Sequence, residues 1–247
     1  MVSVMMAAGT TVQPNREQVH HLFDQGDLVP VYRRLLADLE TPVSVYIKLA
    51  HMGTVSFLLE SVEGGEQVGR YSFLGVNPKG VIMVRDGIVT RTLHGETTTR
   101  PLDVGEDPLG AVEAEFGRVR PVPIEGLPRF VGGAVGFVAY DCVRHFERVP
   151  DTAVDELDVP DVAFMLADTL VIFDHAKHQL IILANAHDLG DRDAAFDDAV
   201  DRIDAITDAL RQPLILPPPS APPLDAPMQS NMTQAQYEAA VIAAKEY

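Results

Sequence analysis

The step Asp86-Gly87 stands between two runs of alternating polar and apolar residues, 80–85 and 88–93. An Asp-Gly pair accepts the positive φ angles of a tight two-residue turn, so this pattern predicts an antiparallel hairpin. Two further apolar runs, 162–173 and 179–185, are predicted to be strands joined by the polar turn 174–178. Hairpins of this kind restrict the chain to a fold built on antiparallel sheets.

A second strand pair is predicted upstream, over residues 55–61 and 70–74. Val55, Phe57 and Leu59 alternate with more polar neighbours, and the alternation places Ser61 at the end of their apolar stripe. The acidic, glycine-containing loop 63–66 follows. In the next strand Arg70 shares a face with Ser72, while Tyr71 and Phe73 share the other.

These side chains suit a small zwitterion with a large side chain. A hydroxyl or carboxylate accepts hydrogen bonds from an ammonium group, and the guanidinium of Arg70 can donate two parallel bonds to a carboxylate. Apolar neighbours would hold the ligand's side chain. On the residues alone, an ordinary strand pair with a polar loop is the favoured interpretation. Strict alternation also points Glu60 away from Ser61, so both reach one ligand only across a bulge.

The same stretch resembles the N-terminal part of the large subunit (component I) of anthranilate synthase. Leu58-Leu59-Glu60-Ser61 carries the resemblance, and further motifs agree in order. These are 41–44, 63–66, 69–75, 132–137, 140–141, 173–175 and 237–247. The resemblance extends over about residues 40–247. It implies an α+β fold of antiparallel β-sandwich-type sheets flanked by helices, the N-terminal part of the chorismate-utilising enzyme fold.

The resemblance also implies a function. The complete enzyme converts chorismate and ammonia, released from glutamine by a separate amidotransferase subunit (component II), to anthranilate and pyruvate. Tryptophan is its feedback inhibitor. The resemblance implies an inhibitor site at Ser61, with Glu60, Leu59, Arg70, Tyr71, Ser72 and the helix-start residue Pro42. Mg²⁺ and the catalytic groups are expected in a half that this chain lacks, so we assign no catalytic residue or cofactor here and expect the segment to be inactive alone.

Two other functions stay open. The large subunit of aminodeoxychorismate synthase has a similar N-terminal half, and its product would distinguish it. A stand-alone amino-acid-binding module is the alternative outside enzymes.

The domain plan expected from the sequence has four parts. Residues 1–14 form a flexible lead, 15–212 the inhibitor-binding domain, 213–229 a proline-rich linker and 230–247 the first helix of the missing catalytic domain. A capping box from Thr233 to Gln236 starts that helix, and we expect a truncated chain that exposes the face meant for its other half. Other helices are predicted over 15–25, 43–51 after Thr41-Pro42 (or a strand over 43–49), 108–119 after Asp107, 141–146 and 191–210.

Charge and composition exclude several classes of function. Lys and Arg number 19 against 36 Asp and Glu, a net charge of −17 that argues against nucleic-acid or anionic-membrane binding. No apolar run approaches the roughly 18 residues of a membrane span, and Cys142 is the only cysteine, so we expect a cytoplasmic protein. Gly132, Gly133 and Gly136 do not have phosphate-loop spacing, and His175 with His178 lacks further metal ligands.

Overall fold

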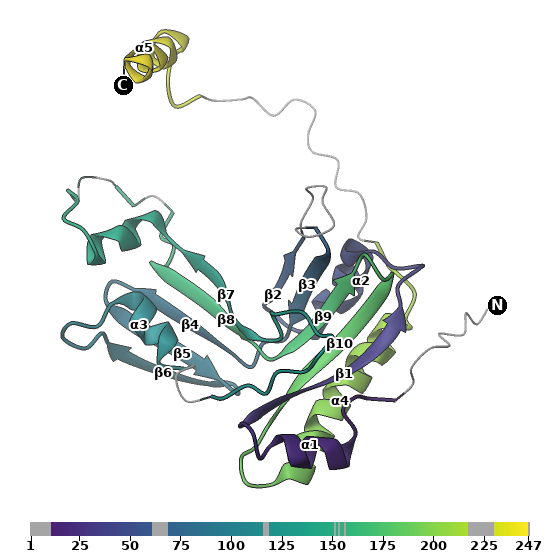
Figure 1. Cartoon of the computed structure of the whole chain (residues 1–247). Helices are drawn as coiled ribbons and strands as arrows, with labels where there is room; N and C mark the ends of the chain where they lie inside the picture. Colours follow the sequence, from purple (N-terminus) through teal and green to yellow (C-terminus); the bar gives the residue numbers. More distant parts are fainter. Residues whose placement is uncertain are drawn as a thin grey trace. The chain divides into compact units, whose positions relative to one another are not determined.

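The computed structural model describes residues 11–60, 69–115, 119–150, 152, 154, 155, 157–216 and 230–246. The chain divides into two compact units, residues 1–215 and 216–247. All ten described strands belong to the first unit, and helix α5 (Gln234–Lys245) belongs to the second (Figure 1). None of the described helices combines the length and the apolar character that a membrane crossing needs.

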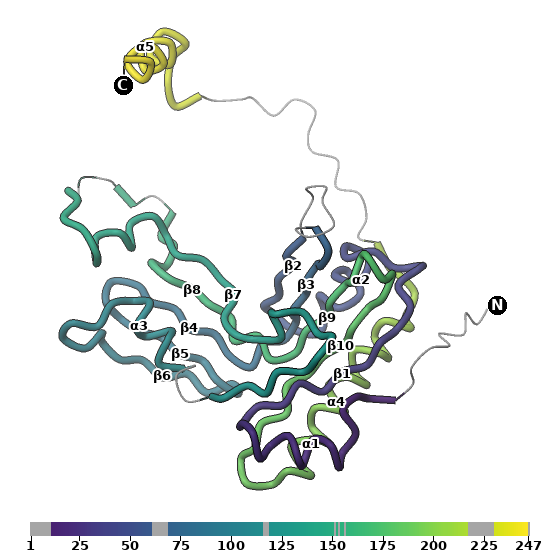
Figure 2. Tube along the Cα trace, viewed as in Figure 1, coloured from purple at the N-terminus to yellow at the C-terminus, as the bar shows by residue number. Residues whose placement is uncertain are grey.

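Two five-stranded antiparallel sheets make up the first unit. The first sheet has the order β1 (Leu28–Leu36), β10 (Gln179–His187), β9 (Thr169–Asp174), β3 (Tyr71–Val76) and β2 (Ser56–Leu59). The second has the order β6 (Glu96–Pro101), β5 (Ile88–Leu93), β4 (Gly80–Arg85), β8 (Val162–Ala167) and β7 (Gly133–Val138). The trace in Figure 2 shows that each sheet combines segments from distant parts of the chain.

Helices cover one face of the first sheet. They are α1 (Arg16–Leu22), α2 (Pro42–Leu49) and α4 (Arg192–Leu210), and their apolar sides form one buried cluster with β1, β9 and β10 (Figure 1). Val19, Leu49 and Ile203 are fully buried in this cluster. The opposite face of the sheet packs against the second sheet, where Leu170 and Ile181 contact a cluster that includes Val135 and Met165. The α+β fold with two antiparallel sheets and flanking helices is therefore confirmed.

Polar side chains fix where the helices begin. Asn15, Thr41, Asp107 and Asp191 each accept a hydrogen bond from a backbone N–H of the first turn of α1, α2, α3 (Pro108–Glu113) and α4. Helix α5 begins in the same way, with a capping box at Thr233. The two 3₁₀ helices, η1 (Ala50–Met52) and η2 (Tyr140–His145), begin without a hydrogen bond from a capping side chain. The helix prediction over 43–51 is confirmed, and the alternative strand over 43–49 is wrong.

Two predictions of secondary structure are wrong, and one strand was missed. The apolar run 162–173 is not one strand, because the chain leaves the second sheet at Ala167 and enters the first at Thr169. The helix predicted over 108–119 ends at Glu113. Strand β6 was not predicted, because all six of its residues are exposed and show no alternation of burial.

Candidate functional site

The predicted inhibitor-binding residues gather in part at one end of the β2–β3 pair. The two strands are antiparallel, with Leu59 opposite Phe73, so Arg70 and Tyr71 lie near the C-terminal end of β2. Leu59 is 47% exposed, and Glu60 is exposed too. Ser61 and the loop 63–66 lie outside the described residues.

The guanidinium of Arg70 is held by a carboxylate of the neighbouring strand. Its Nε and Nη2 donate to the two oxygens of Asp174 at 3.0 and 2.8 Å, and its Cζ lies 4.8 Å from the centre of the Tyr71 ring. Burial alone would raise the pKa of Asp174, but the hydrogen bonds and charge of Arg70 outweigh it and hold that pKa below its ordinary value. Burial, with the charge of Asp174, raises the pKa of Tyr71, so its hydroxyl stays protonated.

Ser72 is fully buried, and its hydroxyl lies 2.8 Å from Nε2 of His175. The His175 ring stacks on Phe173 with centroids 6.0 Å apart. Sequence reasoning singled out 173–175 as a motif but did not pair it with β3. The register of β3 against β9, which sets Tyr71 opposite Asp174, brings these two segments together.

Pro42 lies elsewhere in this arrangement, at the first position of α2, and is buried. The helix is tied to β2 by a hydrogen bond of 2.9 Å between the hydroxyls of Tyr46 and Ser56. The structure thus brings Arg70, Tyr71 and Ser72 together with Asp174 and His175, while Pro42 belongs to a helix that braces the other end of β2.

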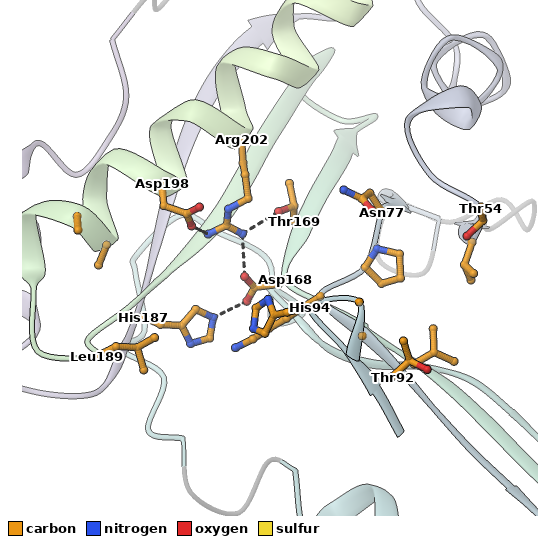
Figure 3. Close-up of a pocket in the computed structure, with 18 of the residues that line it drawn as sticks. Thr54, Asn77, Thr92, His94, Asp168, Thr169, His187, Leu189, Asp198 and Arg202 are labelled. Atoms are coloured by element: carbon orange, nitrogen blue, oxygen red, sulfur yellow. Dashed lines mark hydrogen bonds and ion pairs between the residues drawn. The ribbon is translucent and has the colours of Figure 1, made fainter. Parts of the chain in front are cut away.

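A second polar centre occupies the junction of the two sheets. It borders a cavity of about 780 Å³ lined by β4, the β5–β6 turn, β9 and α4 (Figure 3). Asp168, the residue between β8 and β9, accepts from Nε2 of His187 at 2.6 Å and from Nη1 of Arg202 at 2.7 Å. Arg202 also donates to Thr169, to the backbone oxygen of Asn185 and to Asp198.

The neighbours of Asp168 stabilise its charged, deprotonated form. Burial would raise its pKa, but the hydrogen bond from His187, followed by the charges of His187, Arg202 and Lys79, holds the pKa below its ordinary value. Sequence reasoning missed this cluster. The available signal was an aspartate inside an otherwise apolar run, because a carboxylate enters a core only with partners.

Nucleophilic and metal-dependent chemistry finds little support in the described part of the chain. Cys142 is buried, and burial raises the pKa of its thiol, which leaves little of the reactive thiolate. The described residues contain no group of three or more His, Cys, Asp or Glu side chains able to hold a metal ion.

Residues 55–247 match the sequence model of a family described as chorismate binding enzyme. The chain belongs to that family. Among curated members of this enzyme group, the chain is 40% identical over 204 residues to anthranilate synthase component 1 of Mycolicibacterium smegmatis, covering 81% of this chain and 38% of the relative. It is 38% identical over 245 residues to that of Pseudomonas putida, covering 94% and 48%.

A solved structure agrees with the fold of this chorismate-binding family. Anthranilate synthase component I from Streptococcus pneumoniae TIGR4 superposes with a TM-score of 0.53 at 23% identity, over 85% of this chain and 44% of that one. The chain spans less than half the length of each of these relatives. The resemblance read from the sequence is therefore confirmed at the level of family and fold.

Proposed function

We propose that this chain is the N-terminal, tryptophan-binding portion of an anthranilate synthase component I. The observation that carries the proposal is the 40% identity to such a protein over 81% of the chain. In the complete enzyme, chorismate and ammonia from a glutamine amidotransferase subunit (component II) would yield anthranilate and pyruvate. That activity, with its Mg²⁺, belongs to the part of the relatives that this chain does not span, and the enzyme would work in the cytoplasm.

The β2–β3 end offers the groups that a bound tryptophan needs. Leu59 and Tyr71 supply half-exposed apolar and aromatic surface, and Glu60 is an exposed carboxylate for the ammonium group. In the sequence Ser61 follows the last residue of β2 by two positions. We assign its hydroxyl as a further acceptor for the ammonium group.

Arg70 would receive the carboxylate of tryptophan. Two of its nitrogens are held by Asp174, which fixes the plane of the guanidinium before the ligand arrives. A fixed donor loses less conformational entropy on binding than a free side chain does. Ser72 would support the site without touching the ligand, since its hydroxyl bonds to His175 beneath this surface. Pro42 contributes through α2, which braces β2.

Feedback inhibition follows if tryptophan binds an inactive arrangement of the enzyme more tightly than the active one. The binding free energies of tryptophan for the two arrangements would differ by about 1–3 kcal/mol, the usual range of allosteric coupling.

Calorimetry on the complete enzyme that contains this chain tests the proposal. Ser61→Phe replaces a small hydroxyl side chain by a bulky apolar ring and should weaken tryptophan binding by at least about tenfold, equal to 1.4 kcal/mol, while ammonia-dependent anthranilate formation continues. Thr152→Phe, at an exposed residue outside the strand pair, is the matched control. Unchanged inhibition of Ser61→Phe would remove this site, and formation of aminodeoxychorismate would reassign the enzyme.

A further inference from the structure

A second, smaller cavity adjoins the same sheet junction. Its volume is about 390 Å³, within the usual range for small-molecule sites. Leu28, Leu93, Val131 and Leu166 contribute apolar wall, and Lys79, Asp168 and His187 line both this cavity and the larger one. None of the described residues among those predicted to bind the inhibitor lines it.

Asn185 lines this cavity, and its buried side-chain oxygen has no partner among the residues that the structure describes. Asn185 is 1% exposed, and its side-chain nitrogen donates to the backbone oxygen of Val131 at 2.9 Å. That bond fixes the amide orientation, because a flipped amide would bring two oxygens together. Oδ1 of Asn185 bonds to none of the described residues. An unsatisfied buried acceptor destabilises the folded protein, and a hydrogen-bond donor on a ligand would satisfy it.

Gly132, the first of two consecutive glycines, allows the chain to pass close to this amide. Gly132 and Gly133 have φ angles of 149° and 134°, which other residues rarely adopt. A Cβ on Gly132 would lie 2.5 Å from Nδ2 of Asn185 and 3.0 Å from the backbone oxygen of Ala167. The cavity wall at Asn185 therefore depends on the absence of side chains here.

The uncompensated charge around the cavity is positive. Of its two acidic residues, Asp168 is bonded to His187 and Arg202, and Glu115 accepts two bonds from Arg91 at 2.7 and 3.1 Å. The side chains of Lys79 and Arg129 form no hydrogen bond or ion pair with any residue that the structure describes, although the charge of Lys79 acts on Asp168 from a distance. A pair of unpaired cations is notable in a chain of net charge −17, and it favours an anionic ligand.

We propose that this cavity binds a small cyclic carboxylate that also carries a hydroxyl or amine, with Lys79 and Arg129 receiving the carboxylate and Oδ1 of Asn185 the hydrogen-bond donor. The ring lies between the apolar walls. The site is separate from the β2–β3 end and does not depend on tryptophan binding there.

Calorimetric titration of the intact protein with 2-, 3- and 4-hydroxybenzoate tests this site. At least one isomer should bind with a dissociation constant of about 1 mM or lower. Benzoate lacks the donor and should bind roughly three- to tenfold more weakly, and phenol, which lacks the charge, should bind more weakly still. Addition of the best isomer should shift the side-chain amide resonance of Asn185 in a ¹⁵N NMR spectrum.

Charge-removing variants locate the binding. Arg129→Gln and Lys79→Gln should each weaken it by about five- to tenfold, because each removes one charge-assisted bond. Arg148→Gln is the matched control, since Arg148 is exposed and does not line the cavity. Ser61→Phe should leave binding unchanged, which separates this site from the tryptophan site. Failure of all three isomers to bind, or equal affinities in wild type, Arg129→Gln and Lys79→Gln, would overturn the proposal.

Discussion

The carboxylate of Asp168 accepts a hydrogen bond of 2.6 Å from Nε2 of His187 at the point where the chain passes from the second sheet to the first. Both side chains are largely buried, with 13% and 18% of their surface exposed. Their contact ties the end of β10 to the β8–β9 junction, so it stabilises the point where the two sheets meet.

Removal of this bond should lower stability. In His187→Ala the carboxylate of Asp168 keeps Arg202 but loses one buried partner, so we expect a loss of about 1–3 kcal/mol in the free energy of unfolding. Urea denaturation followed by circular dichroism measures it. His21→Ala, at an exposed position of α1, should change stability by less than about 0.5 kcal/mol. Equal midpoints for the two variants would show that the bond does not hold the junction.

Stability should fall in acid because of Asp168 and Asp174. The pKa of each is held below its ordinary value of 3.8 in the folded protein, so the unfolded chain binds more protons near that pH. Their contribution is complete above about pH 4 and is lost as the pH falls through the lowered pKa values. Melting temperatures between about pH 2 and 7 measure the effect.

A neutral variant separates this contribution from general acid unfolding. Asp174→Asn should melt lower at neutral pH, because Arg70 loses its charged partner, and its melting temperature should depend less on pH below about 4. Asp201→Asn, at an exposed position without an ion pair among the described residues, should keep the wild-type pH profile. A profile of Asp174→Asn parallel to that of wild type would contradict the assignment.

Gly136 in β7 should not tolerate a methyl group. A Cβ there would lie 1.9 Å from the backbone oxygen of Ala163 on β8, so Gly136→Ala must push two paired strands apart. We expect a loss of about 1–3 kcal/mol, typical of overpacking.

Gly110→Ala is the matched control for that loss. Gly110 lies within α3, and a Cβ there would have no neighbour closer than 3.7 Å. Alanine favours the helix over glycine by up to about 1 kcal/mol, so this variant should be neutral or stabilising. Chemical denaturation of both variants measures the contrast, and a stable Gly136→Ala protein would mean that β7 and β8 pair less closely than described.

The outer edge of the second sheet should promote self-association. Strand β7 is an edge strand, and Phe137 and Val138 are 46% and 45% exposed, with Tyr140 at 87% directly after it. Edge strands with apolar side chains pair readily with other chains. Phe137→Lys with Val138→Glu should reduce the oligomer fraction in sedimentation velocity runs.

Replacing an exposed apolar side chain that does not lie on an edge strand should reduce self-association less. Val104 is fully exposed in the loop before α3, so Val104→Lys removes an apolar side chain but changes no edge. This variant should sediment like wild type. If Val104→Lys and the double variant of β7 reduce self-association equally, the edge strand is not the cause of that association.

Local sequence patterns predicted the elements whose causes are local. Asp86 and Gly87 adopt φ angles of 50° and 72°, as a tight hairpin turn requires, and β4 and β5 have the predicted bounds. Thr41 and Asp107 cap their helices as predicted. A capping side chain accepts a hydrogen bond from a backbone N–H only two or three residues later in the chain, so its effect is local.

Pairings between distant segments could not be predicted in this way. The ion pair of Arg70 with Asp174 joins residues 104 positions apart, and only the register of β3 on β9 places them together. The break at Asp168 was missed for the same reason, since its partners His187 and Arg202 are supplied by later segments. The spacing of apolar residues predicts which side of a strand is buried, but it does not predict the sheet to which the strand belongs.

The pairing of β1 has a consequence for synthesis of the protein. Strand β1 ends at Leu36 and pairs in its sheet with β10, which begins at Gln179. At about 5–20 residues per second, a ribosome adds the intervening residues in roughly 7 to 30 s. Throughout that interval Val29 and Val31, which are fully buried in the finished protein, have no strand to cover them. Until β10 is made, the nascent chain therefore exposes apolar strand residues of the kind that chaperones bind.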